Sequence, residues 1–271
     1  MGVAQVLVKD ESRRFGLNAF KALGGSYAMA RCLGQRLGWP EEKLTFEALM
    51  APEVREKLGE LTFVPAADGN HGRGVAWAAR QLGHKSVVYM PKGSARERLD
   101  NIRAQGAQAE ITDLNYDDAV RLANRMGKEH GWILVQDTAW PGYEEIPAWI
   151  MQGYGTMASE AAEQLRQLGV NRPSHVFVQA GVGSLAGAVV GYFTNLFPND
   201  PPKFIIMEAQ AADCLYRGAR AGDGSPRIVD GDLQTIRAGL ACAAPHTISC
   251  VILRNQAPAS RSGCSAVNAS P

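Results

Sequence analysis

A lysine near the start of a predicted helix is the first residue of this sequence with a type and position suited to chemistry. Lys21 lies in the segment NAFKALGG, and Asn18 is expected to cap the helix that follows. The positive end of the helix dipole and burial both disfavour an ammonium group, so we expect a lowered pKa and a neutral amine. A neutral amine is the form that reacts with a carbonyl compound to give a Schiff base. An ordinary surface lysine is the alternative that this segment alone leaves open.

Polar residues follow two of the apolar runs. The segment AADGNHGRG holds Asp68, Asn70 and His71 among three glycines, which allow backbone to approach a ligand closely. A turn between a strand and a helix is where α/β sheets bind ligands, although Asp68 or Asn70 acting as a plain helix cap is equally compatible. We expect His71 to be packed or hydrogen-bonded rather than a base. Asp137, in the segment QDTAW, is expected from the sequence alone to cap a turn.

A second glycine loop lies in QAGVGSLAGAV, again between a predicted strand and a predicted helix. Backbone N–H groups at Gly181, Gly183 and Ser184 are suited to holding a phosphate, helped by the helix dipole. The loop also nearly matches the dinucleotide pattern GxGxx(G/A), with Ala186 in the last position. However, an acid that ends the next strand is not clearly placed about 20 residues further on, since Asp200 lies before that strand, and the loop does not open a first βαβ unit. We therefore expect a phosphate rather than a dinucleotide.

Short apolar runs alternate with helical patterns along the chain. The predicted strands cover residues 6–9, 61–66, 86–90, 109–112, 132–136, 175–179 and 204–208. The predicted helices cover residues 18–37, 71–82, 95–105, 117–130, 146–168, 184–196 and 213–219. Several runs are continuously apolar, as expected of strands buried on both faces of a parallel sheet. The pattern therefore predicts an α/β protein.

The composition argues against several classes of partner. Hydrophobic residues make up 46% and charged residues 20% of the 271 residues, and the formal net charge is +1. We therefore expect no nucleic-acid partner and no membrane partner, and no apolar run reaches the roughly 20 residues of a membrane span. The five cysteines are scattered without a CxxC pair, which argues against a disulfide framework and against a zinc site. We expect no metal and a cytoplasmic location.

Taken in order, these segments resemble the fold type II pyridoxal-phosphate enzymes, which include serine and threonine dehydratases, threonine synthase and the tryptophan synthase β chain. The stretches FGLNAFKALGGS, DGNHGRGVAW, VQDTAWPGYEEIPAWIMQGY and QAGVGSLAGAV are similar to the diaminopropionate ammonia-lyase family. The similarity runs from about residue 6 to about residue 253. It implies a tryptophan synthase β-like fold with two αβα subdomains and the cofactor cleft between them. The expected small domain covers residues 68–143, and residues 1–67 and 144–253 would form an incomplete large domain.

The resemblance also implies a role for each candidate residue. Lys21 would hold pyridoxal 5'-phosphate as a Schiff base, and Asn70 would lie beside the phenolic oxygen of the cofactor. The residues that would bind the phosphate are Gly181, Val182, Gly183 and Ser184. Asp68 stands where the dehydratases of this fold commonly carry a serine, so it would act as a second base on the face of the substrate opposite Lys21. Asp137 would help to bind the amino group of the substrate.

The implied reaction is an α,β-elimination that converts 2,3-diaminopropionate, in both its D and L forms, to pyruvate and ammonia. A serine or threonine dehydratase of the same fold and a catalytically inactive fragment are the alternatives, and a nicotinamide-binding protein is a more distant one. The family resemblance implies a small amino-acid substrate and a homodimer. The sequence leaves the family pattern from about Cys250, and residues 254–271 are expected to form an irregular tail. We therefore expect a chain that is truncated at both ends, with a shifted reading frame or a gene fragment as the hypothesis for the tail.

Overall fold

A four-stranded parallel sheet forms one half of the molecule. The computed structural model of the chain describes residues 2–231, 233, 235 and 238–256. The strands, in the spatial order β3-β2-β1-β4, are β1 (Thr62–Val64), β2 (Lys85–Met90), β3 (Gln108–Ile111) and β4 (Ile133–Leu134). The helices that connect them are α4 (Asn70–Gln81), α5 (Arg96–Arg103) and α6 (Tyr116–His130). The side chains of Val64 and Val88 are fully buried, as their continuously apolar runs predicted.

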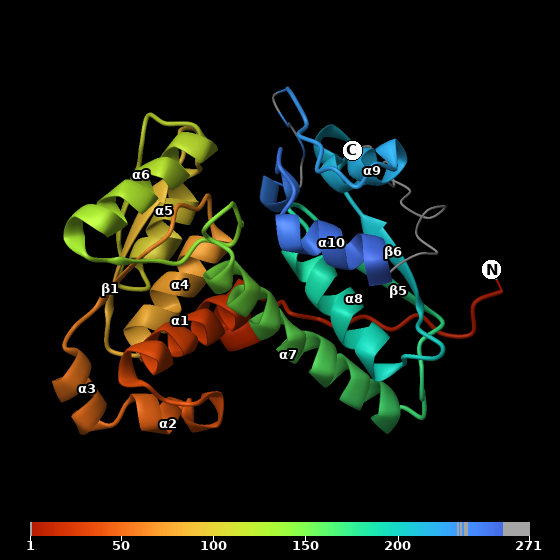
Figure 1. The fold of residues 1–271 in the computed structure, drawn as a ribbon, viewed down its shortest axis with the longest axis horizontal. Coiled ribbons are helices and arrows are strands. Elements are labelled where there is room, and N and C mark those ends of the chain that lie inside the picture. The colour runs from red at the N-terminus through yellow and green to blue at the C-terminus, as the bar shows by residue number, and fades with distance from the viewer. Residues whose placement is uncertain (1, 232, 234, 236–237, 257–271) are drawn as a thin grey trace.

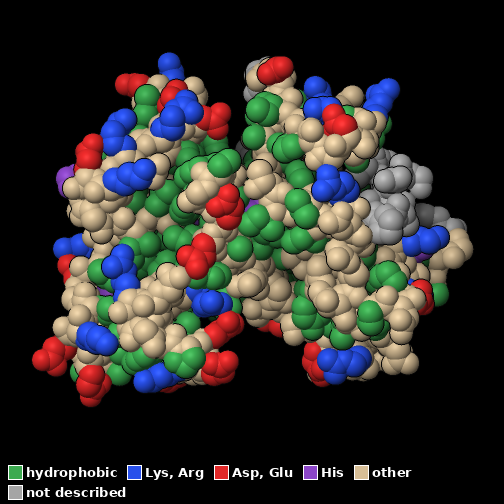
Figure 2. All heavy atoms as spheres, in the orientation of Figure 1, with side chains coloured by type: hydrophobic (Ala, Val, Ile, Leu, Met, Phe, Trp, Pro, Cys, Tyr) green, Lys and Arg blue, Asp and Glu red, His purple; other side chains and the backbone are tan. Residues whose placement is uncertain are grey.

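A two-stranded parallel sheet lies in the other half. Strands β5 (His175–Gln179) and β6 (Lys203–Met207) pair along their whole length. Helix α8 (Ser184–Leu196) connects them and packs against α10 (Thr247–Gln256), while α9 (Cys214–Ala221) follows β6. In the space-filling view, the outline of the molecule is notched between its two halves (Figure 2).

Two long helices pack against each other where the halves meet. Helix α1 (Lys21–Leu37) contacts both α4 and α7 (Glu145–Gln167), and α7 also contacts α8 (Figure 1). Glycines allow this close approach, because a Cβ atom added at Gly153 would lie 2.5 Å from the carbonyl oxygen of Leu23. A Cβ atom added at Gly24 would lie 2.6 Å from the ring of Tyr154. The crossing of α1 and α7 therefore depends on small residues, and it brings the start of α1 to the centre of the molecule.

Short helices that the sequence analysis did not predict complete the fold. Helix α2 (Phe46–Leu49) begins after Thr45, whose hydroxyl oxygen accepts the N–H of Ala48, and α3 (Pro52–Leu58) begins with a proline. The 3-10 helices are η1 (Arg14–Gly16), η2 (Glu41–Lys43), η3 (Gln210–Ala212) and η4 (Ala238–Leu240). Helix α10 also went unpredicted, and it includes residues 254–256 of the expected tail; residues 257–271 lie outside the described part of the chain.

The prediction of a strand at residues 6–9 is wrong. These residues belong to no strand, and Val6 and Val8 are 81% and 83% exposed. Ion pairs hold the segment instead: the Lys9 ammonium lies 2.9 Å from a carboxylate oxygen of Glu160 on α7, and Arg14 binds the same carboxylate. An apolar run becomes a strand only where a sheet edge is available to it, and that cannot be read from the run itself.

The other six predicted strands are confirmed within a few residues, as are the seven predicted helices. The α/β class with parallel sheets is confirmed. The domain boundaries at residues 68 and 143 stay a prediction. Among the described residues, no helix is both long and apolar enough to cross a membrane.

Candidate active site

Lys21 is the first residue of α1, and its side chain meets the segment that follows β4. Its Nζ atom lies 2.6 Å from Oδ2 of Asp137, and 22% of the Lys21 side chain and 11% of the Asp137 side chain are exposed. The ring centroids of Phe20 and Tyr154 each lie 5.7 Å from Nζ. One carboxylate and two aromatic faces therefore surround the amino group.

Two expectations for Lys21 are wrong. Asn18 does not cap α1, because the helix follows directly on Phe20 without a side-chain cap, and Asn18 itself has a left-handed φ of 55°. Burial favours a lowered pKa for Lys21, but the charge and hydrogen bond of Asp137 outweigh burial and raise the pKa above its ordinary value. Lys21 is therefore an ammonium group in an ion pair and not a neutral amine.

Asp137 is fixed by side chains that continue the sheet beyond the ends of β1 and β4. The amide of buried Gln136 accepts the N–H of Ala66 and donates to its carbonyl oxygen, both at 2.9 Å. The Tyr143 hydroxyl accepts the N–H of Gln136 at 2.8 Å and donates to the carbonyl oxygen of Leu134 at 3.0 Å. These side-chain hydrogen bonds take the place of backbone bonds between the chain segments beyond β1 and β4. They hold Gln136 in place, and with it the next residue, Asp137. Its partner is the Lys21 ammonium, and the expected role as a turn cap is wrong.

His71 is the second residue of α4 and lies next to the carboxylate of Asp137. Its ring is 5% exposed, Nε2 lies 2.8 Å from the carbonyl oxygen of Val135, and Nδ1 lies 3.7 Å from Oδ2 of Asp137. The expectation of a packed, hydrogen-bonded histidine is confirmed. Burial raises the pKa of Asp137, but the neighbouring His71 ring and the Lys21 ammonium, which also donates a hydrogen bond, outweigh burial and hold this pKa far below its ordinary range.

Asp68 and Asn70 lie on the turn that leads into α4. Arg98 on α5 binds Oδ2 of Asp68 in an ion pair, and it donates to the carbonyl oxygen of Asp68 at 3.3 Å. The second carboxylate oxygen of Asp68 is buried without a hydrogen-bond partner. Asn70 is the first residue of α4 and its side chain is exposed. The structure therefore places Asp68 with Arg98, and not in the ion pair of Lys21.

The glycine loop joins the same site through Asp137. Gly183 precedes α8 with a left-handed φ of 101°, a conformation that favours glycine. The hydroxyl of Ser184 donates to the carbonyl oxygen of Asp137 at 3.2 Å, and the N–H of His246 donates to the carbonyl oxygen of Val182 at 2.7 Å. Lys21, Asp137 and Ser184, which are far apart in the sequence, are thus linked by two hydrogen bonds.

Four residues near these groups were not identified from the sequence. The Sγ atom of Cys242 lies where it would be 2.9 Å from a Cβ atom added at Gly181, so the glycine is required there. The others are His246, which is fully buried, Tyr154 and Arg98. An arginine on a polar helix and a tyrosine on an apolar one look like a solvated face and a core residue, so the sequence carried no signal for them.

The arrangement suits a cofactor that has a carbonyl group at one end and a phosphate at the other. The amine of Lys21 provides the group that bonds to a carbonyl, and the first N–H groups of the 13-residue helix α8 have no partner within the helix. A glycine with a left-handed φ opens that helix end to an anion. The donor set therefore fits a phosphorylated carbonyl compound.

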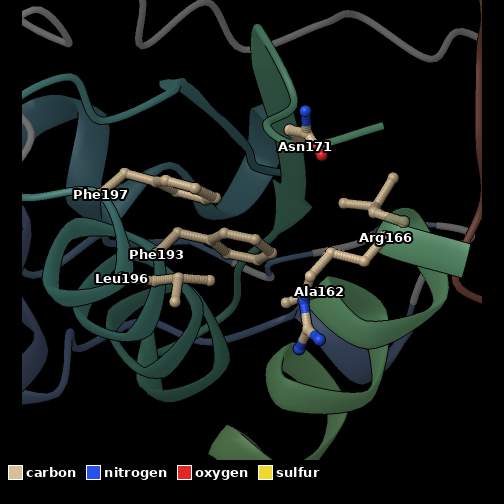
Figure 3. A pocket seen from close by; sticks show the side chains of 7 residues that line it. Ala162, Arg166, Asn171, Phe193, Leu196 and Phe197 are labelled. Atoms are coloured by element: carbon tan, nitrogen blue, oxygen red, sulfur yellow. The ribbon is translucent and has the colours of Figure 1, made fainter. Parts of the chain in front are cut away.

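A separate small cavity lies between the far ends of α7 and α8 (Figure 3). Its volume is about 80 Å³, and the residues that line it are Ala162, Leu165, Arg166, Asn171, Phe193, Leu196 and Phe197. This volume is below the roughly 300 Å³ of the smallest usual ligand sites. Ala162 is eight residues beyond Tyr154 on the same helix, about 12 Å along its axis, so the cavity is not part of the site around Lys21.

The fold and the site define the class of the protein as an α/β enzyme in which a lysine and a glycine loop suited to a phosphate lie in one centre. The chain belongs to the pyridoxal-phosphate dependent enzyme family, whose sequence profile matches residues 1–259. It is 56% identical over 255 residues to a diaminopropionate ammonia-lyase of Salmonella typhimurium, covering 94% of this chain and 63% of that one.

Solved structures also show similarity to this family, and they confirm the fold type II architecture that the sequence predicted. A crystal structure of diaminopropionate ammonia-lyase from Escherichia coli in complex with D-serine is similar with a TM-score of 0.85 and 51% identity, covering 94% of this chain and 62% of that chain. The same enzyme in complex with an aminoacrylate-PLP azomethine reaction intermediate has a TM-score of 0.79 and 51% identity, covering 92% of this chain and 60% of that chain. The chain thus spans less than two thirds of the length of these relatives.

Proposed function

We propose that this chain, with pyridoxal phosphate bound, converts D- and L-2,3-diaminopropionate to pyruvate and ammonia. The observation that carries the proposal is the Lys21–Asp137 ion pair, which lies one hydrogen bond from the glycine loop at Ser184. The similarity to diaminopropionate ammonia-lyases supports the choice of substrate.

The residues that would hold the cofactor belong to three segments. Lys21 would bond to its carbonyl carbon, the backbone N–H groups of residues 181–184 would bind its phosphate, and Asn70 would lie beside its ring oxygen. When bound, pyridoxal phosphate supplies an electron sink that stabilises negative charge on the α-carbon of an amino acid.

The proton transfers are assigned to two side chains of the chain itself. Lys21 would remove the α-proton of the L isomer, and Asp68 would remove that of the D isomer from the opposite face. The ion pair with Arg98 keeps the Asp68 carboxylate in one orientation, which supports its use as a base. Asp137 would bind the amino group of the substrate, since its carboxylate already binds the Lys21 ammonium.

A serine or threonine dehydratase activity is the alternative, and Asp68 is the residue that argues against it. The test is to express the chain, add pyridoxal phosphate, and measure pyruvate from D- and L-diaminopropionate and keto acid from serine and threonine. Turnover of both diaminopropionate isomers in excess of serine and threonine supports the proposal. Turnover of serine or threonine alone would assign the dehydratase function, and absence of any turnover would assign the inactive fragment.

Covalent attachment of the cofactor gives a readout that does not depend on turnover. Borohydride reduction followed by peptide mass analysis is expected to place the cofactor on Lys21, and on no lysine in the Lys21→Ala variant. Attachment at exposed Lys85 instead, which pairs with Glu60, would contradict the assignment.

We also propose a cytoplasmic location and a homodimer. The thiols of Cys32, Cys214, Cys242 and Cys250 are free, which supports a reducing compartment. The homodimer rests on the family resemblance alone, and light scattering on the purified chain, giving the mass of one chain or of two, tests it.

A further inference from the structure

The protonation of His71 follows from its contact with the backbone. The carbonyl oxygen of Val135, 2.8 Å from Nε2, can only accept a hydrogen bond, so Nε2 must carry a proton. The ring is 5% exposed, and burial followed by the charge of Lys21 outweighs Asp137 and the backbone contact, which lowers the pKa of His71. The ring is therefore neutral with its single proton on Nε2, and Nδ1 presents a lone pair.

This lone pair has no donor in the structure. Nδ1 of His71 is buried without a hydrogen-bond partner, and the polar atom facing it at 3.7 Å is Oδ2 of Asp137, itself an acceptor. A separation of 3.7 Å is too long for a hydrogen bond. Two buried acceptors that face each other are costly unless a donor lies against both of them.

The ammonium group of Lys21 provides a positive charge beside these two acceptors, Nδ1 of His71 and Oδ2 of Asp137. This ammonium lies 2.6 Å from the same Oδ2 atom that faces Nδ1 of His71. An ammonium group carries three N–H donors, so one such group can serve a carboxylate oxygen and a neighbouring imidazole nitrogen together. Once Lys21 bonds to a cofactor, the buried carboxylate loses this partner.

We propose that Nδ1 of His71 and Oδ2 of Asp137 form a two-point receptor for the second amino group of a diamino-acid substrate; the Lys21 ammonium contacts only its Oδ2 point. This assignment rests on the proposed function and names His71 as a specificity-determining residue. A hydroxyl group, as in serine, is neutral and offers one hydrogen, so it would leave one acceptor unpaired beside a buried carboxylate. A site built for several donors rejects an analogue that lacks them.

The receptor is tested first without cofactor or turnover. In the Lys21→Ala chain the receptor is free, and methylammonium is the probe, with methanol as the neutral control. We expect saturable binding of methylammonium, seen as a rise in the midpoint of thermal unfolding and as a change in the ¹⁵N signal of His71 Nδ1, and no response to methanol.

Two substitutions of His71 distinguish the roles of its two ring nitrogens. In His71→Gln the amide N–H can still donate to Val135 while the acceptor at Nδ1 is lost, so we expect methylammonium to bind Lys21→Ala/His71→Gln about ten-fold more weakly. In His71→Asn a polar atom remains near the Nδ1 position while the Val135 contact is lost. Methylammonium binding should therefore fall less than in His71→Gln, although the His71→Asn chain should be less stable than the His71→Gln chain. Equal binding by the Gln and His forms, or no binding by Lys21→Ala, would overturn the proposal.

The wild-type chain gives a measurement that needs no variant of His71. The ¹⁵N spectrum of the five histidines should show His71 with its proton on Nε2 and none on Nδ1; a proton on Nδ1 overturns the proposal. In the loaded enzyme, His71→Gln should lower kcat/KM for diaminopropionate relative to serine by about ten-fold. Absence of diaminopropionate turnover in the wild type would refute the proposed function, whereas the methylammonium result decides the receptor independently.

Discussion

The ammonium of Lys21 and the carboxylate of Asp137 form an ion pair at 2.6 Å across 116 positions of sequence. Lys21 begins α1, which packs along α7, and Asp137 follows β4 at the edge of the four-stranded sheet. The ion pair therefore connects the start of α1 to the end of β4 in the four-stranded sheet. It also favours the charged form of the Lys21 amine.

Replacing Asp137 with asparagine should make the Lys21 amine easier to deprotonate and should destabilise the chain. Burial then acts on the pKa of Lys21 without its main opposing charge, so the pKa should fall from its raised value. Because the change leaves a partly buried ammonium unpaired, we expect a loss of about 3 kcal/mol in the free energy of unfolding. Urea unfolding and ¹³C NMR titration of the Lys21 side chain measure the two effects.

The double variant Lys21→Met/Asp137→Asn is the matched control. It removes both charges, so it should be more stable than Asp137→Asn. An Asp137→Asn chain with unchanged stability and an unchanged Lys21 titration would show that the ion pair contributes nothing.

Arg98 should matter for the D isomer of the substrate more than for the L isomer. It binds the carboxylate and the backbone carbonyl of Asp68, the proposed base for the D isomer. Arg98→Gln should therefore lower kcat/KM for D-diaminopropionate by about ten-fold or more and leave that for the L isomer within about three-fold. Arg96→Gln, on the same helix with a side chain that is 73% exposed, is the control. Equal losses for both isomers in Arg98→Gln would mean that Arg98 supports the fold and not Asp68.

Most of the fold was predictable because the sheet strands are continuous apolar runs between glycine-rich turns. The apolar runs that became β1 and β2 are mostly buried, as their composition predicted, whereas Phe177 of β5 is 68% exposed. The run at residues 6–9 has the same composition and forms no strand, since pairing depends on a neighbouring edge that lies elsewhere in the chain.

The candidate site was predictable residue by residue but not as a set of contacts. Segments around Lys21 and Ser184 were identified from local spacing, which fixes the turn and the helix start. The partner of Lys21 was not identified, because the sequence around Asp137 is typical of a turn. Asp137 meets the lysine only through the packing of α1 on α7. The same cause produced the wrong expectation of a neutral lysine: local sequence gives the helix dipole, while the deciding charge comes from Asp137.

The crossing of α1 and α7 predicts opposite effects for two glycines of one helix. A Cβ atom at Gly153 would lie 2.5 Å from the carbonyl oxygen of Leu23, whereas one at Gly155 would meet nothing within 4 Å. Gly153→Ala should lower the free energy of unfolding by about 1–3 kcal/mol through overpacking. Gly155→Ala should raise it by up to about 1 kcal/mol, because alanine favours the helix. Urea unfolding measures both, and a neutral Gly153→Ala would show that the two helices can separate without cost.

Glu208 should make the stability of the chain depend on pH near neutrality. Its side chain is buried after β6 and accepts the N–H groups of Leu215 and Tyr216 at the start of α9. Burial raises the pKa of Glu208 from 4.5 to about 7. Between these values the folded chain holds a proton that the unfolded chain has lost, so the free energy of unfolding falls as pH rises through this window, by up to about 3 kcal/mol.

The measurement that isolates Glu208 is the difference between wild type and Glu208→Gln. Buried histidines such as His246, whose pKa burial lowers to about 4, change the stability of both chains in the opposite direction, so their contribution cancels in the difference. Glutamine keeps an acceptor for the N–H groups of α9 and cannot ionise. Relative to wild type, Glu208→Gln should therefore gain stability steadily from pH 4.5 to pH 7 and show a constant difference above that. Urea unfolding at half-unit pH intervals follows the difference, and a difference that does not change with pH would mean that Glu208 ionises in the folded chain as it does in water.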